Sequence, residues 1–195
     1  FYSAFMVSNS QNAQAKNWQV RYGNSGPTIP ATSGNYDCSG VNMNRYITLN
    51  VAKDSLISIR FATDAANTPV RIVSGDSVYD FTTTSTSLTT TTTYYAGANT
   101  MTIYGDVKDF RCYANKTKIT GIDVSKNVAL CTLSCYDNNI SALDVSKNTA
   151  LTSLSCYYNQ LTSLDISQNT ALTYLSCGGN QLTSLDLSQN VALCT

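Results

Sequence analysis

Apolar and polar positions recur with a strict 21-residue period in the second half of the chain. The gap-free units are residues 119–139, 140–160 and 161–181, and a further unit begins at residue 182. In one unit Leu151, Leu154 and Cys156 alternate with serines, which predicts a short β-strand with leucine and cysteine inward. Because one unit cannot bury its apolar face alone, the period predicts a stack of coils around a continuous core.

The rest of each unit also has an interpretation. We expect Asn159 to turn the chain and to bond backbone amides of the next coil. Leu161, Leu164 and Ile166 then fill the core from the opposite side. A coil of this length and composition leaves no room for a helix, so the far side is predicted to be extended or turn-like.

A degenerate unit precedes the regular ones. It consists of Val107, Phe110, Cys112 and Asn115, with two extra residues before Ile119. We therefore predict a solenoid with little or no helix over residues 106–195, made of a degenerate first repeat, three full 21-residue repeats and one partial repeat.

Residues 1–105 lack this period and instead show short alternating segments. The predicted strands are residues 46–52, 55–63, 69–75, 77–83 and 99–105. Turn-prone breaks separate them at the spacing of an antiparallel sandwich, so a β-sandwich-like domain is expected over residues 1–105, and the fold class is mainly β. The threonine-rich stretch 82–97 suits an edge strand as well as a loop. Trp18, Val20 and Tyr22 are expected to form one further strand.

The repeat resembles a known family. The pattern L-x-x-L-x-C-x-x-N-x-L, formed by Leu151, Leu154, Cys156, Asn159 and Leu161, is similar to leucine-rich repeats. The leucine spacing repeated within LTSLDIS resembles the 21-residue bacterial subclass called IRREKO. This resemblance implies a surface or secreted protein of Gram-negative gut or oral anaerobes, with an extracellular or cell-surface location and a signal peptide removed.

Composition excludes several classes of function. Twelve basic and twelve acidic residues give no net charge, so nothing favours phosphate binding and no nucleic-acid partner is expected. No apolar run approaches the roughly 18 residues of a membrane-spanning helix.

Catalytic chemistry has little support in the composition. The chain has no histidine, and all of its acidic residues are aspartates. Ser-His-Asp and Cys-His sites are therefore impossible within it, and we expect no enzyme, no cofactor and no metal. A weaker alternative is a glycosidase that uses an aspartate pair of the N-terminal domain, such as Asp76 and Asp80.

Two columns of residues could bind metal ions, but each also has a structural interpretation. The cysteine column supplies one thiol per coil, without the paired spacing of a zinc site, and is expected to act as a buried apolar column. Its members are Cys112, Cys135, Cys156 and Cys177. The aspartate column lacks the further oxygen ligands that calcium requires, so turn capping is favoured. Its members are Asp123, Asp144, Asp165 and Asp186.

Outward strand positions are the candidate binding surface. Tyr113, Tyr136 and Tyr157 should align as a tyrosine stripe, which offers flat apolar area with a polar tip. The remaining candidates are Arg111, Ser134, Ser155 and Tyr174. The competing interpretation is that tyrosine merely tolerates exposed β positions.

The function predicted from these features is a non-enzymatic binding module that recognises a protein or carbohydrate ligand through the strand face. The alternatives are a structural scaffold within a larger surface protein and the glycosidase above. An end-to-end homodimer through the uncapped C-terminal repeat is a further expectation, because the last unit leaves core leucines without a cap.

Overall fold

The computed structural model describes residues 40–193, which form two β-sheets and one short 3-10 helix. The strands are β1 Tyr46–Val51, β2 Leu56–Thr63, β3 Pro69–Ser74, β4 Ser77–Thr82, β5 Thr92–Tyr95, β6 Thr100–Tyr104, β7 Val107–Arg111, β8 Ile119–Asp123, β9 Thr132–Ser134, β10 Ser153–Ser155 and β11 Tyr174–Ser176. The 3-10 helix η2 spans Lys116–Lys118. The mainly β fold with little helix is confirmed, and no helix in the described part is long and apolar enough to cross a membrane.

The N-terminal strands form two layers around an apolar core. One sheet has the order β4-β3-β6-β1-β8, and the other has the order β11-β10-β9-β7-β2-β5. All five predicted strands are present as β1, β2, β3, β4 and β6, and their pairings are antiparallel. Strand β5 lies within the threonine-rich stretch and is an edge strand beside β2. The strand predicted around Trp18, Val20 and Tyr22 lies outside the described residues.

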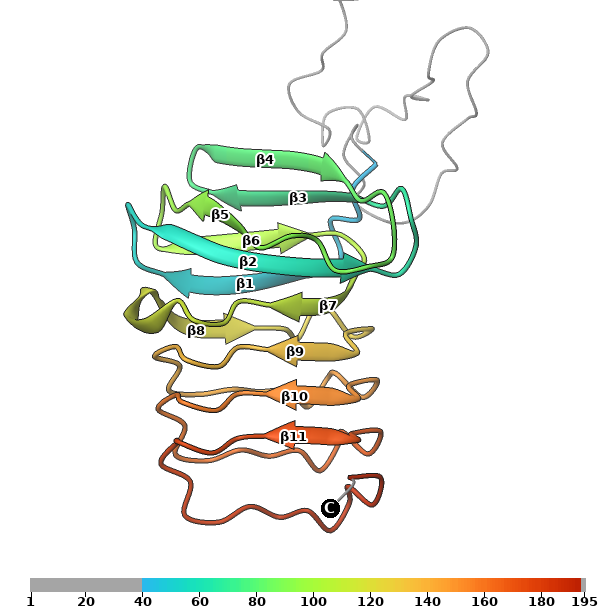
Figure 1. The fold of residues 1–195 in the computed structure, drawn as a ribbon, viewed down its shortest axis with the longest axis vertical. Helices are drawn as coiled ribbons and strands as arrows, with labels where there is room; N and C mark the ends of the chain where they lie inside the picture. The colour runs from blue at the N-terminus through green and yellow to red at the C-terminus, as the bar shows by residue number, and fades with distance from the viewer. Residues whose placement is uncertain (1–39, 194–195) are drawn as a thin grey trace, which may run out of the picture.

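Strands β7, β9, β10 and β11 stack in parallel, one per coil (Figure 1). Their central inward residues are in register and are Phe110, Leu133, Leu154 and Leu175. The first three are fully buried, as the repeat period predicts. Phe110 is in register with Leu133, and the degenerate first repeat stays a prediction.

Hydrogen-bonded strands connect the N-terminal layers to the solenoid. Strand β2 pairs with β7 through Phe61 and Phe110, and β1 pairs with β8 through Leu49 and Ile122. Apolar side chains of both parts belong to one continuous core. The predicted boundary between residues 105 and 106 lies between β6 and β7 and stays a prediction.

Asparagine side chains bridge neighbouring coils behind the strands. The Nδ2 group of Asn159 donates to the carbonyls of Cys135 and Cys156 at 3.0 and 3.1 Å, and its Oδ1 accepts from the Ile140 amide at 3.0 Å. Asn180 repeats this pattern one coil later. Asn159 therefore bonds the preceding coil, so the predicted contact with the next coil is wrong in direction.

A second asparagine ladder runs through the far side of the coils and was not predicted. Its members are Asn127, Asn148, Asn169 and Asn190. Each donates from Nδ2 to a carbonyl of the preceding coil, and the last three bond two such carbonyls. The six carbonyls bonded by the last three members also accept backbone amides within their own turns, so the ladder adds bonds between coils.

Candidate binding surface on the strand face of the repeats

The strand face of the repeats presents parallel columns of outward side chains, because alternate residues of each strand point away from the core. One column, here called the serine row, consists of Ser134, Ser155 and Ser176 in register. The tyrosine stripe lies two residues further along each coil. Backbone bonds beyond the strand ends continue the spacing there, since the Ala114 amide donates to the Tyr136 carbonyl at 3.0 Å.

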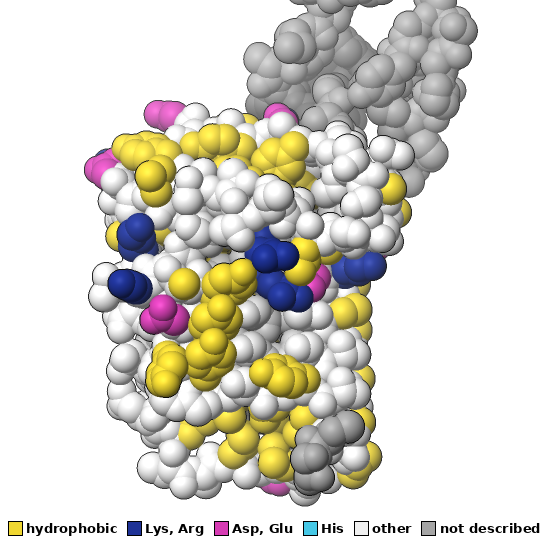
Figure 2. Space-filling model, in the orientation of Figure 1, with side chains coloured by type: hydrophobic (Ala, Val, Ile, Leu, Met, Phe, Trp, Pro, Cys, Tyr) yellow, Lys and Arg dark blue, Asp and Glu magenta, His cyan; other side chains and the backbone are white. Residues whose placement is uncertain are grey.

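The tyrosine stripe is an ordered stack of rings. The rings of Tyr113 and Tyr136 lie 4.7 Å apart with an interplanar angle of 4°, and those of Tyr136 and Tyr157 lie 4.3 Å apart at 9°. These separations follow from the spacing of about 4.8 Å between neighbouring strands. Figure 2 shows a row of hydrophobic side chains along this face, with basic side chains beside one end of the row.

The stack stops at the fourth coil. Position 178 carries a glycine, and a Cβ built there would meet nothing within 4 Å. Tyr158 does not continue the stack, because its ring meets that of Tyr157 edge-on at 5.3 Å and 69°. The space beside Gly178 is therefore open to another ring.

Arginine and aspartate meet at the other end of the strand face. The Nε and Nη2 atoms of Arg111 donate to the two carboxylate oxygens of Asp109, each at 2.9 Å. This bidentate contact raises the pKa of Arg111, and nearby Tyr113 and Tyr136 add to the shift. Burial is the largest cause of the raised pKa of Tyr136, followed by its neighbour Tyr157.

The predicted candidate residues do not all share one column. Arg111, Ser134 and Ser155 are in register with one another. Tyr174 lies in register with Ser153, outside the tyrosine stripe, and is 54% exposed. Ser134 was expected on an open surface, but only 7% of it is exposed, so it contributes less surface than Ser155.

Arg60 belongs to this surface and was missed from the sequence. It lies on β2 directly opposite Arg111 of β7, and its Nη1 donates to the Tyr113 hydroxyl at 3.4 Å. The available signal was its outward position between the buried Ile59 and Phe61. The pairing of β2 with β7 could not be inferred from the sequence, so Arg60 had no neighbours to define its role.

The cysteine column is mostly buried, as predicted. Burial raises the pKa of Cys112 and of Cys156 to about 12, and it raises the pKa of Cys135 well above the ordinary thiol value. Cys177 is a correction to the prediction, because it is partly exposed in the last complete strand. Within residues 40–193 no three His, Cys, Asp or Glu side chains cluster as metal ligands would.

The aspartate column caps turns. Each carboxylate accepts a hydrogen bond from the backbone amide two residues later at 2.8–2.9 Å, which is the contact expected for turn capping. These bonds lower the pKa of three members, Asp144, Asp165 and Asp186.

The aspartates of the weaker glycosidase alternative have different surroundings. Asp80 accepts two hydrogen bonds from Arg71, at 2.6 and 2.8 Å, which engage both of its carboxylate oxygens. Asp76 lies in the exposed turn between β3 and β4. A glycosidase uses two carboxyl groups that both face the substrate, and Arg71 engages both oxygens of Asp80.

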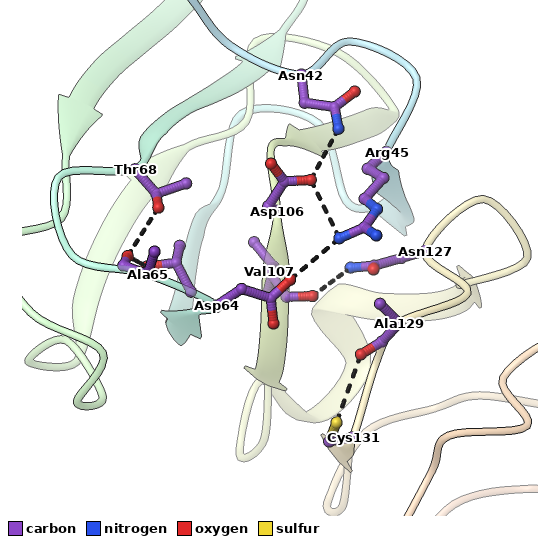
Figure 3. Close-up of polar contacts among 11 residues, drawn as sticks. Asn42, Arg45, Asp64, Ala65, Thr68, Asp106, Val107, Asn127, Ala129 and Cys131 are labelled. Carbon is purple, nitrogen blue, oxygen red and sulfur yellow. Dashed lines mark hydrogen bonds and ion pairs between the residues drawn. The ribbon is translucent and has the colours of Figure 1, made fainter.

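A polar cluster joins the N-terminal layers to the first coil (Figure 3). Arg45 lies 3.1 Å from a carboxylate oxygen of Asp64 and 3.1 Å from one of Asp106, and Asn42 donates to Asp106 at 2.7 Å. Asn127 of the second ladder donates to the Val107 carbonyl nearby at 2.8 Å. Arg45 contacts both carboxylates, so the cluster orients the loops that carry them.

Comparison with a protein-family model supports the presence of leucine-rich repeats. Residues 149–191 match the family model for leucine-rich repeats in two copies, so the chain contains leucine-rich repeats. The finer bacterial subclass stays a prediction. No curated protein matches the chain at a significant level.

Two solved structures are similar to part of the chain. The functional domain of InlJ from Listeria monocytogenes, described as including a cysteine ladder, is 42% identical over 45% of this chain, with a TM-score of 0.44. A leucine-rich repeat protein from Leptospira interrogans is 30% identical over 36% of this chain, with a TM-score of 0.34. In each case the match spans 19% of the other protein.

Proposed function

We propose that the chain is a non-enzymatic binding module that recognises a protein partner through the strand face of its repeats. The observation that carries this proposal is the stack of three tyrosine rings, held at 4.7 and 4.3 Å by the strand ladder beneath it. Leucine-rich repeats generally serve as protein-interaction modules, and the strand side of a solenoid is a habitual binding surface.

The stack suits binding because its side chains are already ordered. A free tyrosine loses rotamer freedom when a partner immobilises it, and that loss opposes association. In the tyrosine stripe the neighbouring rings restrict Tyr136 before any partner arrives. Less entropy is then lost on binding, and the outward ring edges of these partly buried tyrosines remain available for contact.

The same geometry favours a protein over a carbohydrate. Sugar rings pack against exposed aromatic faces, but both faces of Tyr136 are covered by Tyr113 and Tyr157. Ring edges and hydroxyl groups match the mixed apolar and polar surface of a polypeptide. A carbohydrate ligand is therefore the second outcome of the test below.

The cellular context of this proposal is a secreted or cell-surface bacterial protein, as the resemblance of the repeats implies. In the scaffold alternative the strand face would bind nothing. The predicted end-to-end homodimer also stays a prediction, which sedimentation velocity over a dilution series would test.

The test selects ligands for the protein from a random peptide library and from a glycan array, and compares variants. The double substitution Tyr136→Ala and Tyr157→Ala should weaken binding of the selected peptides by at least about tenfold, as expected for central aromatic contacts. A matched control replaces Tyr46 and Tyr104, a paired tyrosine couple on the other sheet, with alanine. That control should bind normally.

Thermal unfolding of both double variants shows whether a loss of binding is simply a loss of fold. Equal affinity of the wild type and the stripe variant would contradict the proposal. Selection of glycans but no peptides would replace the protein partner with a carbohydrate. Failure to select any ligand would favour the scaffold alternative.

A further inference from the structure

Two arginines lie side by side where the strand face meets the N-terminal layers. Arg60 of β2 and Arg111 of β7 are directly paired across the sheet, so both side chains point to the same outward face. Like charges in directly opposed positions destabilise a sheet. Asp109 offsets one of them through its two bonds to Arg111, which leaves one net positive charge from the three groups.

Arg60 carries that remaining charge. No carboxylate among residues 40–193 lies within 4 Å of it, and its polar contact is the 3.4 Å bond from Nη1 to the Tyr113 hydroxyl. Its Nε is buried without an acceptor. A guanidinium has five N–H donors, so most of its bonding capacity is unused inside the protein. A small rotation of this group would direct a pair of donors toward an incoming anion.

The arginine pair continues directly into the proposed binding surface. Arg60 and Arg111 are in register with the serine row, and the tyrosine stripe runs beside that row. The serine hydroxyls make no recorded side-chain hydrogen bond within the described part of the chain. Basic side chains lie beside one end of the row of hydrophobic side chains in Figure 2. An extended ligand along the serine row would therefore bring one of its ends to Arg60.

We propose that Arg60, beside Arg111, binds a carboxylate of an acidic segment of the partner protein. The inference rests on the proposed function and adds the charge of the ligand and its direction along the repeats. A carboxylate fits because the planar guanidinium fork bonds two carboxylate oxygens at once. Charge complementarity also restricts the partner, since a cationic segment would meet an unneutralised arginine.

The test uses short fluorescent peptides and equilibrium anisotropy. One probe alternates aspartate with tyrosine, and its neutral counterpart alternates asparagine with tyrosine. The wild type should bind the acidic probe at least about tenfold more tightly than the neutral one, with a difference that decreases as salt is added. Polygalacturonate serves as the anionic carbohydrate probe.

Variants then locate the effect. Arg60→Gln should remove most of the preference for the acidic probe, and Arg60→Lys, which keeps the charge without the planar fork, should retain part of it. Lys126→Gln removes one positive charge from an exposed turn outside the strand face and should change nothing. Thermal unfolding shows whether each variant is folded. If Arg60→Gln does not fold, Arg60→Lys still tests the inference.

Several results would overturn the inference. These are equal affinity for the acidic and neutral probes, an unchanged preference in Arg60→Gln, and an equal loss in Lys126→Gln. Absence of acidic-probe binding also overturns it, and polygalacturonate binding through Arg60 would assign the site to a carbohydrate. If the wild type shows no preference for the acidic probe while its binding still depends on Tyr136 and Tyr157, this inference alone is overturned. Insensitivity to both tyrosines would overturn the proposed function instead.

Discussion

The two asparagine ladders make different bonds, and this difference predicts different costs for the same substitution. Asn148 is fully buried, and its Nδ2 donates to the carbonyls of Val124 and Asn127 at 3.0 and 2.8 Å. Each carbonyl keeps a second bond from a backbone amide, whereas Oδ1 of Asn148 is buried without a partner. Asn148→Ala therefore removes two ordinary hydrogen bonds and relieves one unsatisfied acceptor, and it should cost about 1–2 kcal/mol.

Asn159 makes two bonds more. Its Nδ2 donates to the carbonyls of Cys135 and Cys156 and, at 3.4 Å, to that of Tyr157. Its Oδ1 accepts from the amide of Ile140, which is itself buried. No other acceptor is recorded for that amide. Asn159→Ala thus removes about 2 kcal/mol of hydrogen bonding and leaves a buried donor unpaired at about 1–3 kcal/mol. The expected total is about 3–5 kcal/mol.

Equilibrium unfolding in urea, followed by far-ultraviolet circular dichroism, measures both free energies. Asn139→Ala, at an exposed position in the equivalent turn one coil before Asn159, is the control and should lie within about 0.5 kcal/mol of the wild type. Unchanged denaturant slopes are needed for the comparison, because a solenoid can lose cooperativity. Equal losses for Asn148→Ala and Asn159→Ala would refute the reasoning, since the Oδ1 bond would then contribute nothing.

Three other features give predictions of their own. Burial raises the pKa of Cys156 to about 12, so this thiol should resist a thiol reagent in the native protein. The partly exposed Cys177 should react, and equal rates of labelling would contradict the burial of Cys156. Gly178→Tyr should stack on Tyr157 and raise the free energy of unfolding by about 0.5–1.5 kcal/mol, while Gly179→Tyr, which would clash with the Tyr158 ring, should lower it. Bonded carboxylates of the aspartate column have lowered pKa values, so their contribution is complete above the ordinary value of 3.8 and is lost as pH falls through the lowered values. At pH values below about 4 the melting temperature should therefore decrease. The decrease should be smaller in a triple variant whose asparagines keep the oxygen acceptor. That variant is Asp144→Asn, Asp165→Asn and Asp186→Asn.

Local patterns accounted for much of the fold. Alternation placed the N-terminal strands within one or two residues, and the 21-residue period gave the register of Leu133, Leu154 and Leu175. Both signals work because inward positions must be apolar wherever a strand covers a core. The alignment of Tyr113, Tyr136 and Tyr157 followed from the same register.

Other features depended on information outside the local pattern. Asn148 lies in a polar segment, so its local sequence predicts an exposed side chain. The recurrence of asparagine at this position every 21 residues was a usable signal of a structural role. The burial of Asn148 goes with two side-chain bonds to carbonyls of the preceding coil, and hydrophobicity does not report such bonds. Arg60 was missed because its neighbours come from β7, about fifty residues later in the chain, and pairing between distant strands is not encoded in either segment alone.

The structure separates the residues that hold the stack from those that are free to bind. Apolar residues and asparagines form the buried part of the coils and aspartates cap their turns, so the outward strand positions can vary from coil to coil. The tyrosine column ends at Gly178, and the serine row ends at Arg111 and Arg60. The strand face therefore changes along its length, from cationic and aromatic beside the N-terminal layers to small and open at the fourth coil. A uniform stack would bind an extended ligand in either direction, whereas this gradient favours one in which the anionic end lies at Arg60.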